Sequence, residues 1–273
     1  MPTRNCEAPD KPGGAGRQNE KPGASNAAGS GNLGAFAPGG RSAHCFTCQA
    51  RARTEWCALS DADLKLIDDS KLDRDHAPGD VLYHQGDPCT GVYCIQSGLV
   101  GLRKVGADGS SVLVRLAQPG DTIGYRSFLA GEEHNLSAEV LKPSLVCFID
   151  RAVTRKLLDT KPELSLRFLK RLADDLDAAE DKFLQLTSFD IRARLAHLLL
   201  VLKERFAAEE KDGALKLELP LSRQDMAAMI GVRPETMSRA ISKFEDDGIA
   251  FFSGRTVQVP DISVLFDEID AES

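Results

Sequence analysis

The feature that most constrains this chain is a regular series of turn motifs between about residues 76 and 150. The turns are Pro78-Gly79-Asp80, Gln85-Gly86-Asp87, Ser97-Gly98, Ala107-Asp108-Gly109 and Pro119-Gly120-Asp121. Short β-prone runs lie between and after them, at 91–95, 111–116 and 144–149. Strands this short and this closely spaced predict a small antiparallel barrel or roll.

After Pro162, which suits the first turn of a helix, apolar residues recur at alternating spacings of three and four. They are Leu169, Leu172, Leu176, Ala179, Phe183 and Leu186. This seam predicts a coiled coil and hence a homodimer, although the same spacing fits a helix packed on its own domain. Acidic residues lie beside it: Asp174, Asp175, Asp177, Glu180 and Asp181. Two copies would repel there, so these residues predict either a marginal dimer or simply a solvated face.

The C-terminal third shows the pattern of a helix, a tight turn and a second helix. Ser222 and Asp225 have the spacing of a capping box, and Gly231 ends the helix that they open. Pro234 suits the first turn of the next helix, which Gly248 ends. A hairpin pattern follows over 249–259, with Ser253-Gly254 as its turn. Together they predict a winged helix-turn-helix.

The second of these helices carries side chains that suit the major groove of DNA. Glu235, Ser238 and Arg239 stand at i, i+3 and i+4 and therefore share one face. Arginine binds guanine in a bidentate manner, glutamate accepts from cytosine, and serine contacts either bases or phosphate. We expect Arg233, Thr236 and Lys243 to add DNA contacts. An ordinary surface ion pair between Glu235 and Arg239 is the alternative.

Composition limits the classes of function. A net charge of -7 argues against indiscriminate binding of nucleic acid. The lack of a long apolar run or a hydrophobic start predicts a cytoplasmic protein without membrane contact. We find no Walker A, G-x-S-x-G or H-E-x-x-H motif, which predicts that the chain is not an enzyme.

The predicted fold class is α+β, with an N-terminal antiparallel β-roll of cupin-like form, a long dimerisation helix and a C-terminal winged helix-turn-helix. The expected divisions are a disordered tail over 1–40, a sensor domain over 41–160, the dimerisation helix over 161–190, the DNA-binding domain over 191–265 and a C-terminal tail over 266–273.

At this point the sequence resembles the CRP/FNR superfamily of bacterial transcription regulators. The resemblance covers about residues 44–265 and is most specific over 119–131 and 231–239. Glu235, Ser238 and Arg239 resemble the Glu-x-x-Ser-Arg pattern of the FNR branch, which implies a TTGAT half-site and RNA polymerase as a partner. Members that bind cyclic AMP carry Arg-Ser in the phosphate loop, whereas the matching stretch here, 133–137, lacks arginine. The resemblance therefore disfavours cyclic-nucleotide sensing, which remains the contrasting hypothesis.

The seven cysteines include a group that the same resemblance explains. Cys45, Cys48 and Cys57 fall within 13 residues, and Cys147 stands in a strand that resembles the one bearing the fourth ligand of the FNR cluster. The resemblance thus implies a 4Fe-4S cluster on these four thiolates, dismantled by oxygen or nitric oxide. Eight residues separate Cys48 from Cys57, unlike the best-known pattern. A 2Fe-2S cluster, zinc held with His44 or Cys147, a thiol–disulfide switch or no cofactor stays open. Cys89 and Cys94 are structural or unassigned, and Cys6 lies in the tail.

Overall fold

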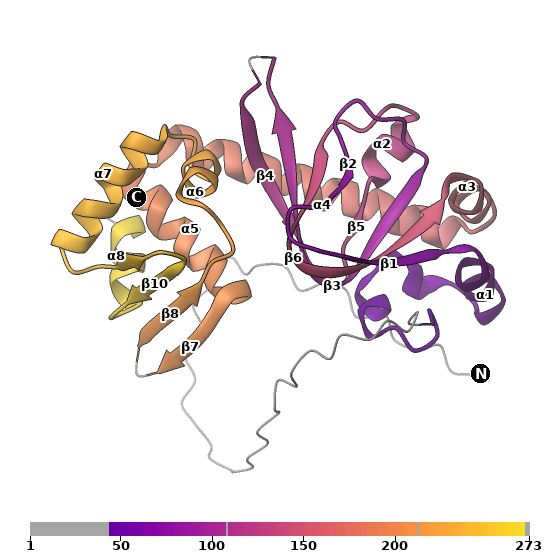
Figure 1. The fold of residues 1–273 in the computed structure, drawn as a ribbon, viewed down its shortest axis with the longest axis horizontal. Helices are drawn as coiled ribbons and strands as arrows, with labels where there is room; N and C mark the ends of the chain where they lie inside the picture. The colour runs from indigo at the N-terminus through magenta and orange to yellow at the C-terminus, as the bar shows by residue number, and fades with distance from the viewer. Residues whose placement is uncertain (1–43, 108, 212, 271–273) are drawn as a thin grey trace, which may run out of the picture.

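The structure, a computed structural model, describes residues 44–107, 109–211 and 213–270. The tail expected over 1–40, with Cys6, lies outside these residues. Within them, an antiparallel sheet domain is followed by the long helix α4 (Pro162–Ser188) and a helix-turn-helix domain (Figure 1). This arrangement confirms the predicted fold class. No helix in the described ranges is long and apolar enough to cross a membrane.

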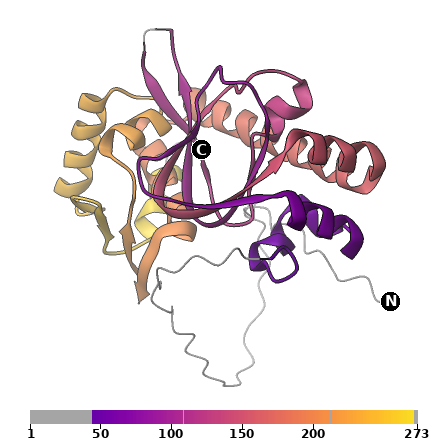
Figure 2. The same ribbon diagram turned by 45° about the vertical axis from the view of Figure 1, so that its right-hand side comes forward.

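The N-terminal domain is a roll whose strands pair in the order β1-β6-β3-β4. Strand β2 also pairs with β6, and β5 with β3. The strands are β1 (Leu72–His76), β2 (Val81–Tyr83), β3 (Gly91–Val105), β4 (Ser111–Ala117), β5 (Thr122–Ile123) and β6 (Ser137–Asp150). Irregularities in the β3–β6 register between Ile95 and Val100 bend the pair, as bulges do. Figure 2 shows the curled sheet nearly end-on.

Short helices cover the end of the roll from which α4 departs. They are η1 (Gln49–Arg53), η2 (Glu55–Ala58), α1 (Asp61–Ser70), α2 (Tyr125–Ala130) and α3 (Arg151–Thr160). Ser60 caps α1 by accepting from the N–H of Asp63, as the sequence predicts. Trp56, Phe128 and Phe168 share one apolar cluster, which fixes the start of α4 to its own domain.

Helix α4 presents two apolar faces. Leu164 and Phe168 are buried against the N-terminal domain, and Leu172 packs against the same cluster. Leu169, Leu176 and Phe183 lie on the other face, with exposed fractions of 58%, 59% and 70%. Further exposed apolar or small residues on α4 are Leu166, Ala179, Leu184 and Leu186. The predicted seam therefore mixes both faces, because Leu172 belongs in part to its own domain.

The C-terminal domain continues beyond the boundary expected at residue 265. Its elements are α5 (Ile191–Phe206), β7 (Ala207–Lys211), β8 (Ala214–Glu218), α6 (Arg223–Met229), α7 (Pro234–Asp246), β9 (Phe251–Ser253), β10 (Thr256–Val259) and α8 (Ser263–Asp270). The strand order is β7-β8-β10-β9. Arg192 of α5 holds α8 through bonds of 2.7 and 2.9 Å to Glu268, so residues 266–270 form part of this domain and are not a tail.

The two domains meet where β3 and β4 approach α6. Leu99, Leu113 and Leu116 of the roll belong to the same apolar cluster as the helix-turn-helix core. Nearby, Nη1 of Arg103 donates to Oδ1 of Asp225 at 2.7 Å, and Nε of Arg103 donates to Glu139 at 2.5 Å. Asp225 also forms the capping box of α6 with Ser222. One carboxylate thus caps α6 and joins it to the N-terminal domain.

We expect Asp225→Asn to lower the free energy of unfolding by about 1–3 kcal/mol, because a charged hydrogen bond to Arg103 is lost. Burial opposes ionisation, but hydrogen bonds from Arg103 and Ser222 outweigh it and hold the pKa of Asp225 below its ordinary value. A lowered folded-state pKa stabilises the protein at pH values above the unfolded pKa of about 3.9. The loss should therefore be equal at pH 5 and pH 7 and shrink below pH 3.9.

Denaturant titration of wild type and variant measures this difference, with Asp246→Asn on exposed α7 surface as the matched control. Equal stability of Asp225→Asn and Asp246→Asn at pH 7 would show that the contact between the domains contributes nothing.

Candidate metal centre and nucleic-acid interface

The segment over 44–58 is held against α1 by Asp68. Oδ1 of Asp68 accepts from the backbone N–H of Cys45 at 2.8 Å, and Oδ2 lies 2.9 Å from Nδ1 of His44. Burial opposes ionisation of Asp68, yet these hydrogen bonds keep its pKa lowered. The short helices η1 and η2 then carry the chain past β3 and towards α4.

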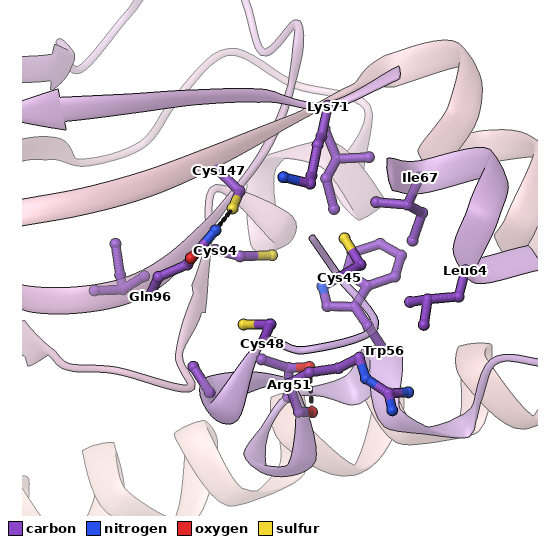
Figure 3. A pocket seen from close by; sticks show the side chains of 14 residues that line it. Cys45, Cys48, Arg51, Trp56, Leu64, Ile67, Lys71, Cys94, Gln96 and Cys147 are labelled. Carbon is purple, nitrogen blue, oxygen red and sulfur yellow. Dashed lines mark hydrogen bonds between the residues drawn. The ribbon is translucent and has the colours of Figure 1, made fainter. Parts of the chain in front are cut away.

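Four thiols surround one cavity. Cys45 and Cys48 reach it from the N-terminal segment, and Cys94 of β3 and Cys147 of β6 reach it from the roll. Cys94 and Cys147 are direct partners in the antiparallel register, so their side chains project from the same face of the sheet. Figure 3 shows the sulfur atoms of all four around one space. The cavity measures about 40 Å³ and is lined mostly by apolar surface.

The donor set at this cavity fits a metal or an iron–sulfur cluster in number and kind, since such sites are held by four thiolates. The four sulfur atoms are not arranged to chelate a metal ion. In the described part of the chain, no group of three or more Cys, His, Asp or Glu side chains has such an arrangement. Lys71 and Gln96 also line the cavity, and the amide of Gln96 donates to the sulfur of Cys147. A bound group would have to displace that contact.

Cys57 lies in η2 with a partly exposed side chain, and it is not among the residues that line the cavity. The structure therefore brings together Cys45, Cys48 and Cys147 of the predicted ligands and places Cys94 where Cys57 was expected.

Burial governs the protonation of three of the cavity thiols. It raises the pKa of Cys45 to about 12 and also raises the pKa of Cys94 and Cys147. For Cys147 a hydrogen bond with Asp73 adds to this effect. Cys45, Cys94 and Cys147 therefore carry their protons at pH 7 in this arrangement, and coordination of a metal would release those protons.

The helix-turn-helix is formed by α6 and α7, with the turn at Gly231. The φ angle of Gly231 is +69°, a left-handed conformation that favours glycine, and a β-carbon there would meet Leu186 of α4. Met237, Ile241 and Phe244 bury one face of α7. The turn and the buried stripe fix the direction in which the opposite face of α7 points.

That opposite face is exposed and carries the predicted DNA contacts. Glu235, Ser238 and Arg239 are all exposed near the start of α7, as is Lys243 two turns later. Arg233, the N-cap residue of α7, is exposed, and Thr236 is half-buried. The hairpin of β9 and β10 lies beside α7, with Arg255 exposed at its turn. This geometry suits a recognition helix with a basic wing.

Comparisons with known proteins agree with both halves of this architecture. Residues 73–161 match the model of the cyclic nucleotide-binding domain, and residues 193–267 match the Crp-like helix-turn-helix domain. The transcriptional activator protein FnrL of Cereibacter sphaeroides is 28% identical over 84% of this chain and 93% of its own. An anaerobic regulatory protein of Pasteurella multocida is 24% identical over 84% of each chain. This chain belongs to the CRP/FNR family of transcription regulators.

A solved member of similar structure is FixK2 from Bradyrhizobium japonicum, with a TM-score of 0.62 and 27% identity over 72% of this chain and 96% of that one. The CRP/FNR assignment confirms the resemblance found in the sequence, and transcription regulators of this family are in general not enzymes.

Two further residues at these sites do not follow from the sequence pattern. Arg255 is exposed at the Ser-Gly turn of the wing, where a basic side chain is a candidate DNA contact. The position of Cys94 opposite Cys147 depends on the pairing of β3 with β6, which local pattern does not fix.

The stretch 133–137 of the roll contains a buried histidine and no arginine. His134 is 3% exposed and stacks on Tyr83 at 3.7 Å between ring centroids. Burial lowers the pKa of His134, so this side chain is neutral at pH 7. A neutral, stacked histidine offers no charge to a cyclic phosphate, which agrees with the absence of arginine from this stretch.

Proposed function

We propose that this CRP/FNR protein is an oxygen- or redox-responsive regulator in which Cys45, Cys48, Cys57 and Cys147 hold a 4Fe-4S cluster. The observation that carries the proposal is that Cys48 and Cys147, far apart in the chain, line one cavity. Bound there, such a cluster would be open to destruction by oxygen or nitric oxide. Loss of thiol ligation would then signal the presence of either gas. The name of the Pasteurella relative, an anaerobic regulatory protein, supports this direction.

Two candidates for the fourth thiolate, Cys57 and Cys94, differ in the change of structure that ligation requires. Cys57 needs η2 to turn so that its side chain reaches the cavity, whereas Cys94 already lines it. Cys57 and Ala58 are the partly exposed residues of η2, whereas Glu55 and Trp56 are buried, so we propose that this turn is confined to residues 57 and 58. We therefore retain Cys57 as the proposed ligand and use Cys94 as its test.

The exposed face of α4 supports a homodimer. Leu169, Leu176 and Phe183 repeat at intervals of seven residues and are exposed in the single chain. Asp177, Glu180 and Asp181 are exposed on the same helix, so self-repulsion keeps the apo dimer weak. Asp175 does not share this role, because it pairs with Arg115 at 2.5 Å.

For DNA, we propose palindromic sites with TTGAT-type halves, read by Glu235, Ser238 and Arg239 from each α7, with contacts from Arg233, Thr236 and Lys243 and with RNA polymerase as a further partner. Exposure of this face and the basic wing turn support the proposal. A function on chromosomal DNA implies a cytoplasmic protein.

We expect anaerobic protein to be mainly dimeric on its operator and air to shift it towards monomer with loss of specific binding. A ligand that binds only the dimer-competent fold moves the equilibrium by its difference in affinity between the two states. Light scattering and operator titration at fixed salt, before and after air exposure, measure both effects. Equal mass and equal operator affinity in the two conditions would contradict the proposal.

A further inference from the structure

The cysteine segment is joined to α4 by two adjacent side chains. Trp56 packs edge-on against Phe168, with ring centroids 5.4 Å apart and an interplanar angle of 75°. Both side chains are almost fully buried, at 3% and 1% exposure. Aromatic pairs of this geometry stabilise a contact beyond what the area that they bury contributes.

Glu55, the neighbour of Trp56, enters a buried polar network on the same helix. Oγ1 of Thr122 donates to Oε2 of Glu55 at 2.7 Å and accepts from Nε1 of Trp56 at 3.3 Å. Nη1 of Arg171, one turn along α4 from Phe168, lies 3.9 Å from Oε1 of Glu55. Residues 55 and 56 therefore contact α4 at two successive positions of its inner face.

The charges around Glu55 do not by themselves hold it in place. Arg171 also pairs with Asp121 and Asp175, and Arg115 pairs with Asp175. Counted as ionised, Glu55, Asp121 and Asp175 set three carboxylates against two guanidiniums. Removal of Glu55 would leave this group balanced, so its buried position depends on the hydrogen bond from Thr122, on the packing of Trp56 and on the rest of the segment.

We propose that Glu55 and Trp56 are positioning residues that couple the cysteine site to α4. Ligation of Cys45 and Cys48 fixes the segment, which keeps Glu55 at Arg171 and Trp56 at Phe168; release of the thiols frees both contacts and loosens the inner face of α4. This inference rests on the proposed function, since it assumes a group bound by the thiols. Glu55 and Trp56 are then the connection through which the group bound by the thiols affects dimerisation of α4.

The coupling has a measurable form. If docking of residues 55 and 56 favours the dimer, loaded protein dimerises more tightly than stripped protein, and the ratio of the two dissociation constants is the coupling. A ratio of about 10 is typical of such linkage. Glu55→Gln keeps an acceptor for Thr122 and removes only the charge. Phe168→Leu weakens the contact with Trp56 from the α4 side and leaves the sequence of the cysteine segment unchanged.

The experiment measures iron content and the dimer dissociation constant, by anaerobic sedimentation, for the full chain loaded with iron and sulfide and after chelation. Wild type, Glu55→Gln, Phe168→Leu and the control Glu163→Gln, an exposed site on α4, are compared. We expect wild-type iron in all four, a ratio of about 10 in wild type and control, and a ratio near 1 to 3 in the two variants. The dimer dissociation constant of chelated Glu55→Gln should equal that of chelated wild type. A merely structural role of Glu55 would change the dissociation constants of both the loaded and the chelated protein.

A wild-type ratio in both Glu55→Gln and Phe168→Leu would overturn the inference, as would loss of iron in Glu55→Gln together with a wild-type ratio in Phe168→Leu. Failure of the proposed function is distinguishable from these outcomes. If the proposed function is wrong, wild type itself binds no iron or shows equal dimer dissociation constants before and after chelation.

Discussion

Cys147→Ser is expected to lose iron, acid-labile sulfide and specific operator binding together while remaining folded. Cys147 is the only predicted ligand on the roll, and it lines the cavity opposite the N-terminal thiols. A hydroxyl in its place keeps the volume but removes the thiolate that iron requires. Iron and sulfide assays on anaerobically purified protein, with operator titration, measure the loss.

The matched control for this variant is Cys89→Ser. Cys89 is equally buried, but its sulfur lies 3.5 Å from the carbonyl oxygen of Gly91 and does not line the cavity. It should keep full iron. The pair Cys57→Ser and Cys94→Ser then identifies the fourth ligand, because only the variant of the true ligand loses iron. Full iron content in Cys147→Ser would disprove the four-cysteine assignment.

Arg239→Ala is expected to abolish discrimination for a TTGAT-type half-site. Arg239 is exposed on the outer face of α7, and a bidentate contact to guanine contributes about 1–3 kcal/mol. This corresponds to a loss of about 5- to 150-fold in preference over a site whose guanine is replaced. Competition between the two sites at fixed salt measures the preference directly.

Lys243→Ala is the control for charge alone, since Lys243 is exposed on α7 two turns from the start of the helix. It should weaken both sites by a similar factor, as loss of a phosphate contact does. Unchanged preference between the two sites in Arg239→Ala would refute the assignment of this side chain to base recognition.

The helix-turn-helix could be predicted from the sequence because its determinants are local. The capping box of Ser222 and Asp225 forms, and Gly231 adopts the positive φ that the turn between α6 and α7 requires. The roll was predictable for a similar reason, since turns separate its strands at short intervals.

The candidate metal centre was only partly predictable because it depends on distant contacts. The register that places Cys94 opposite Cys147 is set by the pairing of β3 with β6. In the same way, Leu172 satisfies the spacing of the α4 seam, but the sensor core that it contacts comes from residues far away in the chain. Asp175 fits a solvated acidic face by sequence, yet Arg115 and Tyr125 hold it in a buried network. The local pattern of residues 266–270 predicts a tail, because the partner of Glu268, Arg192, is 76 positions away.

Iron and acid-labile sulfide analysis of wild-type protein purified without air, with its absorbance spectrum, shows whether the thiols at the cavity hold an iron–sulfur cluster. We expect brown protein with a broad band at about 400 nm and about four iron and four sulfide per chain, as a 4Fe-4S cluster requires. Colourless protein that contains one zinc per chain, or neither metal, would contradict this expectation.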